Sequence, residues 1–280
     1  MVQETKREDL KNAPVGVFDS GVGGLTVMRE IMRQIPNESI IYFGDTARVP
    51  YGNKSKETVT RFSRQIVHFL KSHQVKTIVV ACNTASAYAL DELEKECDIP
   101  IMGVVKPGAK AAVEATRNGK IGVIATEATI GSGIYSHYIK ELKSSATIYG
   151  KACPLFVPLV EEGLWEDPVT EEIARRYLAE LIDNDIDTLI LGCTHYPLIR
   201  STVRKVIGEQ VTLVNPAYET AIELRKVLAD NGLLREAAPK LGENQYQFYV
   251  SDMAEKFKVF ANSIIKYGIL SAKTVNIEDY

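Results

Sequence analysis

The stretch Thr77-Ile-Val-Val-Ala-Cys82-Asn-Thr84 decides the fold, because it recurs later in the chain as Thr188-Leu-Ile-Leu-Gly-Cys193-Thr-His195. Each copy has a threonine, an apolar run, a small residue, a cysteine and then polar residues. A second pair, Gly16-Val-Phe-Asp-Ser20 and Gly122-Val-Ile-Ala-Thr126, occurs in the same order. The offsets of the two pairs, 111 and 106 residues, are similar enough to indicate two duplicated halves.

Working outward from this repeat, short apolar runs alternate with amphipathic helical patterns along the whole chain. Nearly continuous apolar character is typical of strands covered on both faces. The predicted buried strands are Val15–Phe18, Ile40–Phe43, Ile78–Ala81, Ile121–Ala125, Leu189–Leu191 and Val211–Val214. The helical faces are formed by Val59, Phe62, Ile66 and Leu70, and by Ile173, Tyr177 and Leu181. This alternation predicts an α/β fold with two pseudo-symmetric domains, each a mostly parallel sheet flanked by helices, and an active site in the cleft between them.

Two turn signals suggest where the chain passes between the domains. Lys106-Pro-Gly108 leaves the first half, and Asn215-Pro216 follows the second. We therefore expect one domain at residues 1–105 plus 215–280 and the other at 106–214. An amphipathic segment at Phe257–Ile264 is expected to close the first domain as a helix. The charged stretch Asp230–Asn244 is expected to be a loop or a short helix.

Composition narrows the class of protein. The chain has 280 residues and a net charge of −3, and its Lys and Arg residues form no basic stripe, so a nucleic-acid partner is not expected. Residues 1–12 lack the apolar core of a signal peptide, and no apolar run reaches the length of about 20 residues that spans a membrane. We expect a cytoplasmic protein with no membrane partner. Its four cysteines, none in a CxxC pair, should then be free thiols.

Four polar clusters follow predicted strands, and each precedes a helical pattern. In parallel α/β sheets ligands bind beyond the carboxyl ends of the strands, where backbone N–H groups and short polar side chains are good carboxylate donors. The clusters are Asp19-Ser20-Gly21, Cys82-Asn83-Thr84, Thr126 with Thr129, and Cys193-Thr194-His195. Without an accompanying group of Arg or Lys, they predict a site for a small anion.

Two of the four cysteines are candidates for chemistry. Cys82 and Cys193 each end an apolar strand and stand at a helix start, where the helix N-terminus favours the thiolate. We expect a lowered pKa for both and a joint catalytic role. Cys97 and Cys153 have no such setting and are expected to be packing residues.

Asp19 and His195 have alternative interpretations. Asp19 could simply cap a helix or a turn, and the glycines after it could suggest phosphate, but neither a P-loop nor a GxGxxG spacing is present. The glycines are expected to let the backbone approach a small substrate. His195 could be structural, or a zinc ligand with Cys82 and Cys193, although Cys-x-His alone is a weak zinc signal. Its place beside a thiol favours catalysis, and we expect no metal.

Taken together, these clusters resemble the glutamate racemases of the aspartate/glutamate racemase superfamily, which act in bacterial cell-wall synthesis. The matching stretches are Gly16-Val-Phe-Asp-Ser-Gly-Val-Gly-Gly-Leu25, Tyr42-Phe-Gly-Asp-Thr46, Val49-Pro-Tyr-Gly52, Ala81-Cys-Asn-Thr-Ala-Ser86 and Leu191-Gly-Cys-Thr-His-Tyr-Pro-Leu198. The resemblance runs from about residue 14 to residue 265. Asn215-Pro216 departs from the Asp-Pro of many members, at a position expected to be structural.

The resemblance implies a role for each matching residue. Cys82 and Cys193 would be the two acid/base groups that flank the substrate α-carbon, with Asp19 assisting the first and His195 the second. Cys82 would remove the proton of the D-enantiomer and Cys193 that of the L-enantiomer. Substrate binding is implied for Asp19, Ser20, Tyr51, Gly52, Asn83, Thr84, Thr126, Thr129, Thr194 and His195, and Glu161 is a weaker candidate for recognising the ammonium group.

A two-base racemase needs one group on each face of the stereocentre, and two duplicated halves can supply one cysteine each. No pyridoxal-type cofactor is evident, so a closing cleft would have to stabilise the carbanion-like transition state. The resemblance implies glutamate as substrate, D-glutamate supply for peptidoglycan and cell shape, and a homodimer. An aspartate or hydantoin racemase, a Cys–His hydrolase and a non-catalytic anion-binding protein remain alternatives, but the last two leave the second cysteine unexplained.

Overall fold

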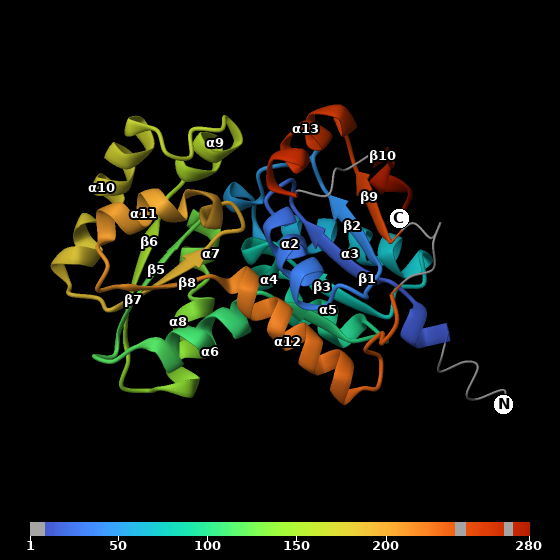
Figure 1. Ribbon diagram of the computed structural model, residues 1–280, viewed down its shortest axis with the longest axis horizontal. Coiled ribbons are helices and arrows are strands. Elements are labelled where there is room, and N and C mark those ends of the chain that lie inside the picture. The colour runs from blue at the N-terminus through green and yellow to red at the C-terminus, as the bar shows by residue number, and fades with distance from the viewer. Residues whose placement is uncertain (1–8, 239–244, 266–270) are drawn as a thin grey trace.

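Two parallel sheets, one in each half of the protein, form its framework (Figure 1). The computed structural model describes residues 9–238, 245–265 and 271–280. The first sheet has six strands in the order β10-β9-β2-β1-β3-β4, and all its pairs are parallel. Its strands are β1 (Val15–Asp19), β2 (Ile40–Gly44), β3 (Thr77–Val80), β4 (Ile101–Gly103), β9 (Tyr246–Val250) and β10 (Lys273–Thr274).

The second sheet repeats the arrangement of the first. It has four parallel strands in the order β6-β5-β7-β8. They are β5 (Lys120–Ala125), β6 (Thr147–Ala152), β7 (Thr188–Gly192) and β8 (Thr212–Val214). The order β2-β1-β3-β4 in the first sheet is the same as β6-β5-β7-β8 in the second, so the two halves are pseudo-symmetric. The sequence repeat pairs β1 with β5 and β3 with β7, in agreement with this common order.

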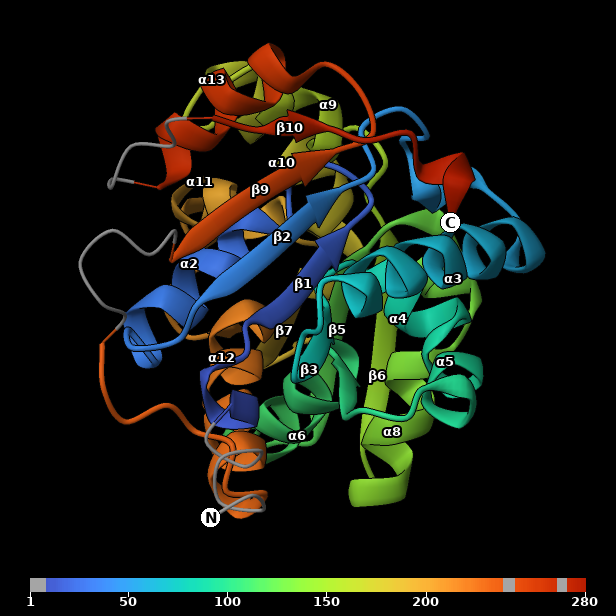
Figure 2. The same cartoon turned by 90° about the vertical axis from the view of Figure 1, so that its right-hand side faces the viewer.

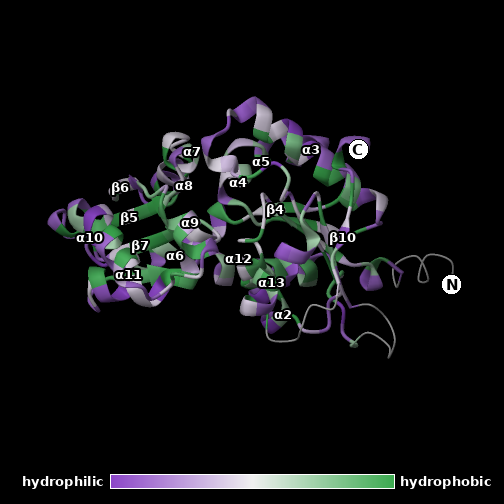
Figure 3. Ribbon diagram, turned by 90° about the horizontal axis from the view of Figure 1, so that it is seen from above, coloured by the Kyte–Doolittle hydropathy of each residue, from purple (hydrophilic) through white to green (hydrophobic). Residues whose placement is uncertain are grey.

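Helices cover both faces of each sheet, because alternate side chains of buried strands point to opposite faces. Val15 and Val17 belong to the core under α2, α12 and α13, whereas Phe18 belongs to the core under α3, α4 and α5. Figure 2 shows α3, α4 and α5 on one side of the first sheet and α2 and α12 on the other. In the second half, α9, α10 and α11 cover one face and α6 and α8 the other. Figure 3 shows hydrophobic strands inside and hydrophilic outer helix faces.

These helices have the following bounds. In the first half they are α2 (Leu25–Gln34), α3 (Lys56–Ser72), α4 (Asn83–Tyr88), α5 (Leu90–Glu96), α12 (Pro216–Asp230) and α13 (Ala254–Ile264), with the 3-10 helices η1 (Tyr51–Asn53) and η3 (Ile277–Asp279). In the second half they are α6 (Val105–Ala115), α7 (Glu127–Gly131), α8 (Ile134–Leu142), α9 (Phe156–Glu161), α10 (Pro168–Asp183), η2 (Tyr196–Ile199) and α11 (Arg200–Ile207).

The two halves are joined by packed side chains. Helix α6 packs against both α8 and α12, and α12 packs against α2. Trp165, Leu198 and Phe260 each contact the cores of both halves. The cleft residues described below are therefore held between two bodies that share an apolar seam.

The structure confirms the predicted α/β class and all six predicted strands, whose ends differ by at most one residue. The helices predicted around Val59–Leu70, Ile173–Leu181 and Phe257–Ile264 are α3, α10 and α13. Strands β4, β6, β9 and β10 were not predicted, since β4 and β10 are very short and β6 is nowhere fully buried.

Two further expectations concern the loop at Asp230–Asn244 and the domain boundaries. In the predicted loop, residues 231–238 form neither helix nor strand, and residues 239–244 lie outside the described part of the chain. The domain boundaries at 105/106 and 214/215 stay a prediction. Within the described ranges, no helix combines the length and the apolar character needed to cross a bilayer.

Candidate active site

The polar clusters of the two halves meet around one small cavity of about 50 Å³. Asp19 is the last residue of β1, and Cys82 follows β3 after one residue. Thr126 follows β5 directly and Cys193 follows β7 directly. The cavity is lined by Ser20, Gly21, Val49, Pro50, Tyr51, Gly52, Cys82, Asn83, Thr84, Thr126, Val157, Glu161, Cys193, Thr194 and His195. Parallel strands bring their carboxyl ends to one edge of a sheet, and here the edges of both sheets supply the lining.

Cys82 lies at the N-terminus of α4. Its Sγ accepts a hydrogen bond from the Ala85 backbone N–H at 3.4 Å and lies 3.7 Å from Ser20 Oγ. The side chain is only 6% exposed. Burial, followed by the nearby Asp19 carboxylate, raises the pKa of Cys82 to about 12, and the contacts from Ala85 and Ser20 only partly oppose this. The expected lowering of its pKa is therefore wrong, because desolvation of the thiolate outweighs the helix N-terminus.

Cys193, His195 and Glu161 form a chain of polar contacts. The Cys193 Sγ lies 3.8 Å from His195 Nδ1, and His195 Nε2 lies 3.0 Å from Glu161 Oε1. Burial by itself lowers the pKa of His195, but the hydrogen bonds with Cys193 and Glu161 raise it to about 10. The hydrogen bond with His195 lowers the pKa of Glu161. An imidazolium is therefore held beside Cys193 at neutral pH, where it stabilises negative charge on the sulfur.

Asp19 lies behind the cavity lining and is fully buried. Its Oδ2 accepts from the Gly21 N–H at 3.0 Å, and its Oδ1 accepts from Thr194 Oγ1 at 3.4 Å. Burial raises the pKa of Asp19, although the charge of His195 and backbone N–H groups act in the opposite direction. Asp19 thus connects the loop after β1 to the loop after β7, and its charge acts on Cys82.

Three threonine hydroxyls lie together at the site, two in the lining and one, Thr129, behind it. Thr84 Oγ1 lies 3.0 Å from Thr126 Oγ1 and 3.3 Å from Thr129 Oγ1, and Thr126 also caps α7 by accepting from the Thr129 N–H. The Asn83 Oδ1 accepts from the Tyr135 hydroxyl at 2.7 Å. The amide nitrogen of Asn83 and the three hydroxyls come from both halves, and such groups can hold a carboxylate.

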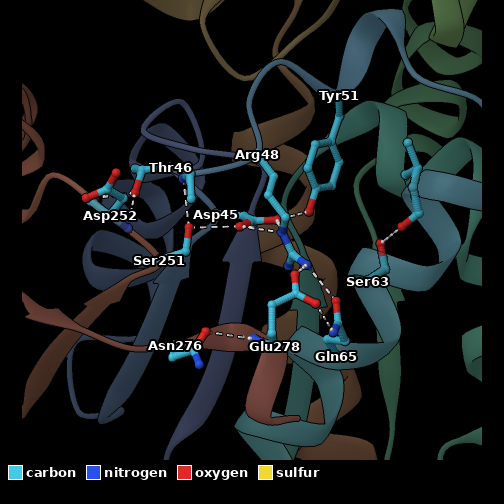
Figure 4. A network of polar contacts seen from close by, with 12 residues as sticks. Asp45, Thr46, Arg48, Tyr51, Ser63, Gln65, Ser251, Asp252, Asn276 and Glu278 are labelled. Carbon is cyan, nitrogen blue, oxygen red and sulfur yellow. Dashed lines mark hydrogen bonds and ion pairs between the residues drawn. The ribbon is translucent and has the colours of Figure 1, made fainter.

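The loop from Val49 to Gly52, which lines the cavity, is held from behind by Asp45 (Figure 4). Asp45 is fully buried and accepts from the Tyr51 hydroxyl, from Arg48 Nε at 2.7 Å and from Ser251 Oγ at 2.8 Å. Arg48 Nη1 also reaches Glu278 Oε1 at 3.1 Å. The Tyr51 hydroxyl is therefore directed to Asp45 (Figure 4).

Glycines allow the two halves to approach each other closely. A Cβ on Gly23 would lie 2.3 Å from Thr194 Oγ1 and 2.5 Å from His195 Nδ1. A Cβ on Gly52 would lie 2.8 Å from Thr126 Cβ. Both distances are well inside van der Waals contact. The glycines after Asp19 were expected to let the backbone approach a substrate, but at Gly23 the space is taken by side chains of the other half.

The geometry agrees with a comparison of the sequence with known families. The sequence profile of the family described as Asp/Glu/Hydantoin racemase matches residues 15–223. The chain belongs to this racemase family. Racemases are isomerases, so the protein is an enzyme of that class.

Relatives of this racemase extend the match to nearly the whole chain. It is 49% identical to the glutamate racemase of Geobacter metallireducens over 264 residues, covering 94% of this chain and 97% of the relative. A solved glutamate racemase of Bacillus anthracis is similar with a TM-score of 0.90 and 44% identity, over 95% of this chain and 98% of that one. The Francisella tularensis glutamate racemase, solved in complex with D-glutamate, has a TM-score of 0.88 and 38% identity, over 96% and 100% of the two chains.

Most of the residues predicted for the site of this racemase line the cavity. Two do not: Asp19 and Thr129 lie behind it and contact lining residues. Glu161 lines the cavity, but its Oε1 is hydrogen-bonded to His195. A hydrogen bond from an ammonium group would therefore be accepted by Oε2. Among the described residues, no three His, Cys, Asp or Glu side chains are placed to hold a metal ion.

Sequence reasoning missed three lining residues and the groups behind them. Val49, Pro50 and Val157 line the cavity. Val49 and Pro50 stand just before the predicted Tyr51, and that proximity was a usable signal. Val157 and the Tyr135 contact to Asn83 carry no sequence signal, because only the packing of the second half brings them to the site.

Proposed function

We propose that this enzyme interconverts L- and D-glutamate by proton transfer at the α-carbon, with Cys82 and Cys193 as its two acid/base groups and no cofactor. The observation that carries the proposal is the pair of thiols. They come from equivalent strand ends of the two halves, line one cavity, and lie close enough for the charge of Cys193 to raise the pKa of Cys82. Glutamate as the substrate is supported by the relatives with that name.

Proton transfer from L-glutamate begins at Cys193. The thiolate of Cys193, stabilised by the His195 imidazolium, takes the α-proton, so the Cα–H bond breaks and an S–H bond forms. The thiol of Cys82, kept protonated by burial and by Asp19, gives its proton to the opposite face of Cα. The product is D-glutamate, with the charge now on Cys82. The reverse reaction begins with the Cys82 thiolate.

The polar residues around the thiols are proposed to hold the substrate. Its carboxylates would be bound by the short polar side chains and backbone N–H groups at the strand ends, and Glu161 and Asp19 would act mainly through His195, Thr194 and Cys82. The proposed binding residues are Asp19, Ser20, Tyr51, Gly52, Asn83, Thr84, Thr126, Thr129, Glu161, Thr194 and His195. These fixed donors lie in a small site with a largely buried lining, where they would stabilise developing negative charge strongly.

The volume of the cavity bears on how substrate enters. A cavity of about 50 Å³ has room for a few water molecules. We infer that the two halves move apart to admit glutamate. Closure afterwards would exclude water from the carbanion-like transition state.

The wider role is also part of the proposal. We infer that the enzyme supplies D-glutamate for peptidoglycan synthesis, works in the cytoplasm and forms a homodimer. Bacterial relatives such as the glutamate racemase of Geobacter metallireducens support the first inference.

The test is an exchange experiment without added cofactor. The purified protein is incubated with L-glutamate in deuterated water, and circular dichroism and the α-proton signal are followed together. We expect loss of optical activity with deuterium entering the α-position. Cys82→Ser and Cys193→Ser should each abolish racemisation, while Cys97→Ser serves as the matched control and should retain it. Racemisation that survives in either site variant would refute the two-base mechanism, and a faster reaction with aspartate would overturn the choice of substrate.

A further inference from the structure

A groove rich in unpaired hydrogen-bond donors lies on the seam between the two halves, apart from the catalytic cavity. It has a volume of about 430 Å³. Its walls come from α2 and α12 of the first half and from η2, α11 and β8 of the second. Figure 1 shows α2 and α12 together on the side of the first sheet that faces the viewer. It is lined by Arg29, Glu30, Arg33, Pro197, Arg200, Leu213, Asn215, Tyr218 and Glu219.

The donors in this groove exceed its acceptors. The side chains of Arg29 and Arg200 make no hydrogen bond or ion pair with any residue in the described ranges. The third arginine, Arg33, pairs with Glu30 at 2.9 Å and lies with its guanidinium carbon 5.5 Å from the centre of the Tyr218 ring. Two guanidinium groups are therefore left without an anion.

Two other polar residues, Asn215 and Glu219, complete the lining of the groove. Asn215 uses its Oδ1 to accept from the Ala217 N–H, which leaves its amide N–H groups as donors. Glu219 is the one carboxylate of the lining that is not paired with an arginine, and burial, followed by Glu114, raises its pKa. Two free guanidinium groups and the Asn215 amide would thus attract an anion in this groove, and one partly buried carboxylate would oppose it.

The groove is one layer of residues away from the catalytic cysteine. A very small cavity between them shares Pro197 and Asn215 with the groove, and Asn83, Cys193 and Thr194 with the catalytic cavity. Arg29 is one helical turn after Thr26, whose hydroxyl donates to the Thr194 carbonyl at 2.8 Å. Arg200 begins α11 directly after the 3-10 helix that follows His195.

We propose that this groove binds a small polyanion, bearing a phosphate or paired carboxylates, that bridges Arg29 and Arg200 and so favours the closed arrangement of the two halves. Guanidinium groups match carboxylate and phosphate oxygens in pairs, which makes arginine well suited to such anions. Because Arg29 belongs to the first half and Arg200 to the second, a shared anion stabilises the closed form more than the open one. Its effect on catalysis rests on the proposed racemase function, whereas its binding does not.

Binding is tested first, on the full chain and without glutamate. Isothermal titration calorimetry with inorganic phosphate and with citrate, at matched ionic strength, distinguishes phosphate from carboxylate ligands. We expect saturable binding of at least one of them at millimolar concentration. Arg29→Gln and Arg200→Gln should each weaken it by about tenfold or more. Arg225→Gln, an exposed arginine of α12 outside the groove, is the matched control and should bind as the wild type does.

Kinetics then test the bridging role. With the anion bound, the KM for L-glutamate should fall by roughly fivefold with little change in kcat, and R29Q and R200Q should lose this effect while keeping the basal rate. Absence of binding to both anions would overturn the proposal, and so would binding that the two variants leave unchanged. Purely competitive inhibition would assign the anion to the catalytic cavity instead. A change in oligomeric state of R29Q or R200Q without loss of anion binding would make the groove a contact between two copies of the chain.

Discussion

Substituting Gly23 by alanine tests whether the close approach of the two halves positions the proposed catalytic groups. The added Cβ would lie 2.3 Å from Thr194 Oγ1 and 2.5 Å from His195 Nδ1, whereas ordinary van der Waals contact begins near 3.4 Å. Thr194 and His195 would have to retreat by about 1 Å, and an error of this size in a catalytic geometry can cost about 100-fold in rate. Neither side chain can move freely, because Thr194 is bonded to Asp19 and His195 to Glu161.

We therefore expect Gly23→Ala to lower kcat/KM for L-glutamate by about 100-fold, which corresponds to about 2.7 kcal/mol of transition-state stabilisation. The substitution should cost about 1–3 kcal/mol of folding stability, as overpacking does, and the protein should remain folded. Racemisation is followed by circular dichroism, and stability by urea denaturation.

Gly131→Ala is the matched control, since a Cβ at Gly131 meets nothing within 4 Å. It should leave kcat/KM unchanged, and its stability should be equal to that of the wild type or slightly higher. If G23A and G131A were equally active, the loop after β1 would not position the site through steric contact with Thr194 and His195, and the reasoning would be refuted.

Three further predictions concern the charges around the site. Glu161→Gln removes the negative charge from one of the two hydrogen-bond partners, Cys193 and Glu161, that raise the pKa of His195 to about 10. The imidazolium is present below that pKa and lost above it, so in the variant it should disappear at lower pH, and kcat/KM for L-glutamate should decline earlier on the alkaline side. An unchanged pH profile would contradict this. Asp19→Asn removes a charge that, after burial, raises the pKa of Cys82. At a fixed, mildly alkaline pH, iodoacetamide should therefore alkylate Cys82 faster in the variant than in the wild type, as measured by peptide mass spectrometry. An equal or slower rate would speak against Asp19 as a cause of the raised pKa. Tyr51→Phe removes one of the hydrogen-bond donors to the buried Asp45 carboxylate. It should lower the free energy of unfolding, measured by urea denaturation, by about 1–3 kcal/mol. The control is Tyr280→Phe, at an exposed tyrosine, which should change this free energy little.

Much of the framework could be predicted from the sequence. Buried parallel strands consist of nearly continuous apolar residues, so strands such as Ile121–Ala125 and Leu189–Leu191 are recognisable without knowledge of their neighbours. The repeated cysteine motif places both thiols at strand ends, because polar residues follow each apolar run. Strand β6, which is only partly buried, lacks this signal, and its place at the sheet edge depends on β5 beside it.

The chemical state of the site was less predictable. The helix N-terminus at Cys82 favours a lower pKa, but the sequence does not show how deeply the folded protein buries the thiol or how near Asp19 lies. Likewise, Asp45 is recognisable only as an acidic residue after a strand. Its partner Ser251 is 206 residues away, and the pairing of β2 with β9 brings the two together.

By itself, the sequence determined the two α/β halves, the equivalent positions of Cys82 and Cys193, and the polar residues that follow each strand. These features are local, since a strand and the residues after it are set by a short run of side chains. Only the tertiary structure decided that Gly23 packs against Thr194 and His195, and that burial makes Cys82 a weaker acid. Both depend on groups that are distant in the sequence and close in space, and pKa and steric fit respond to the groups that surround a residue in the folded protein.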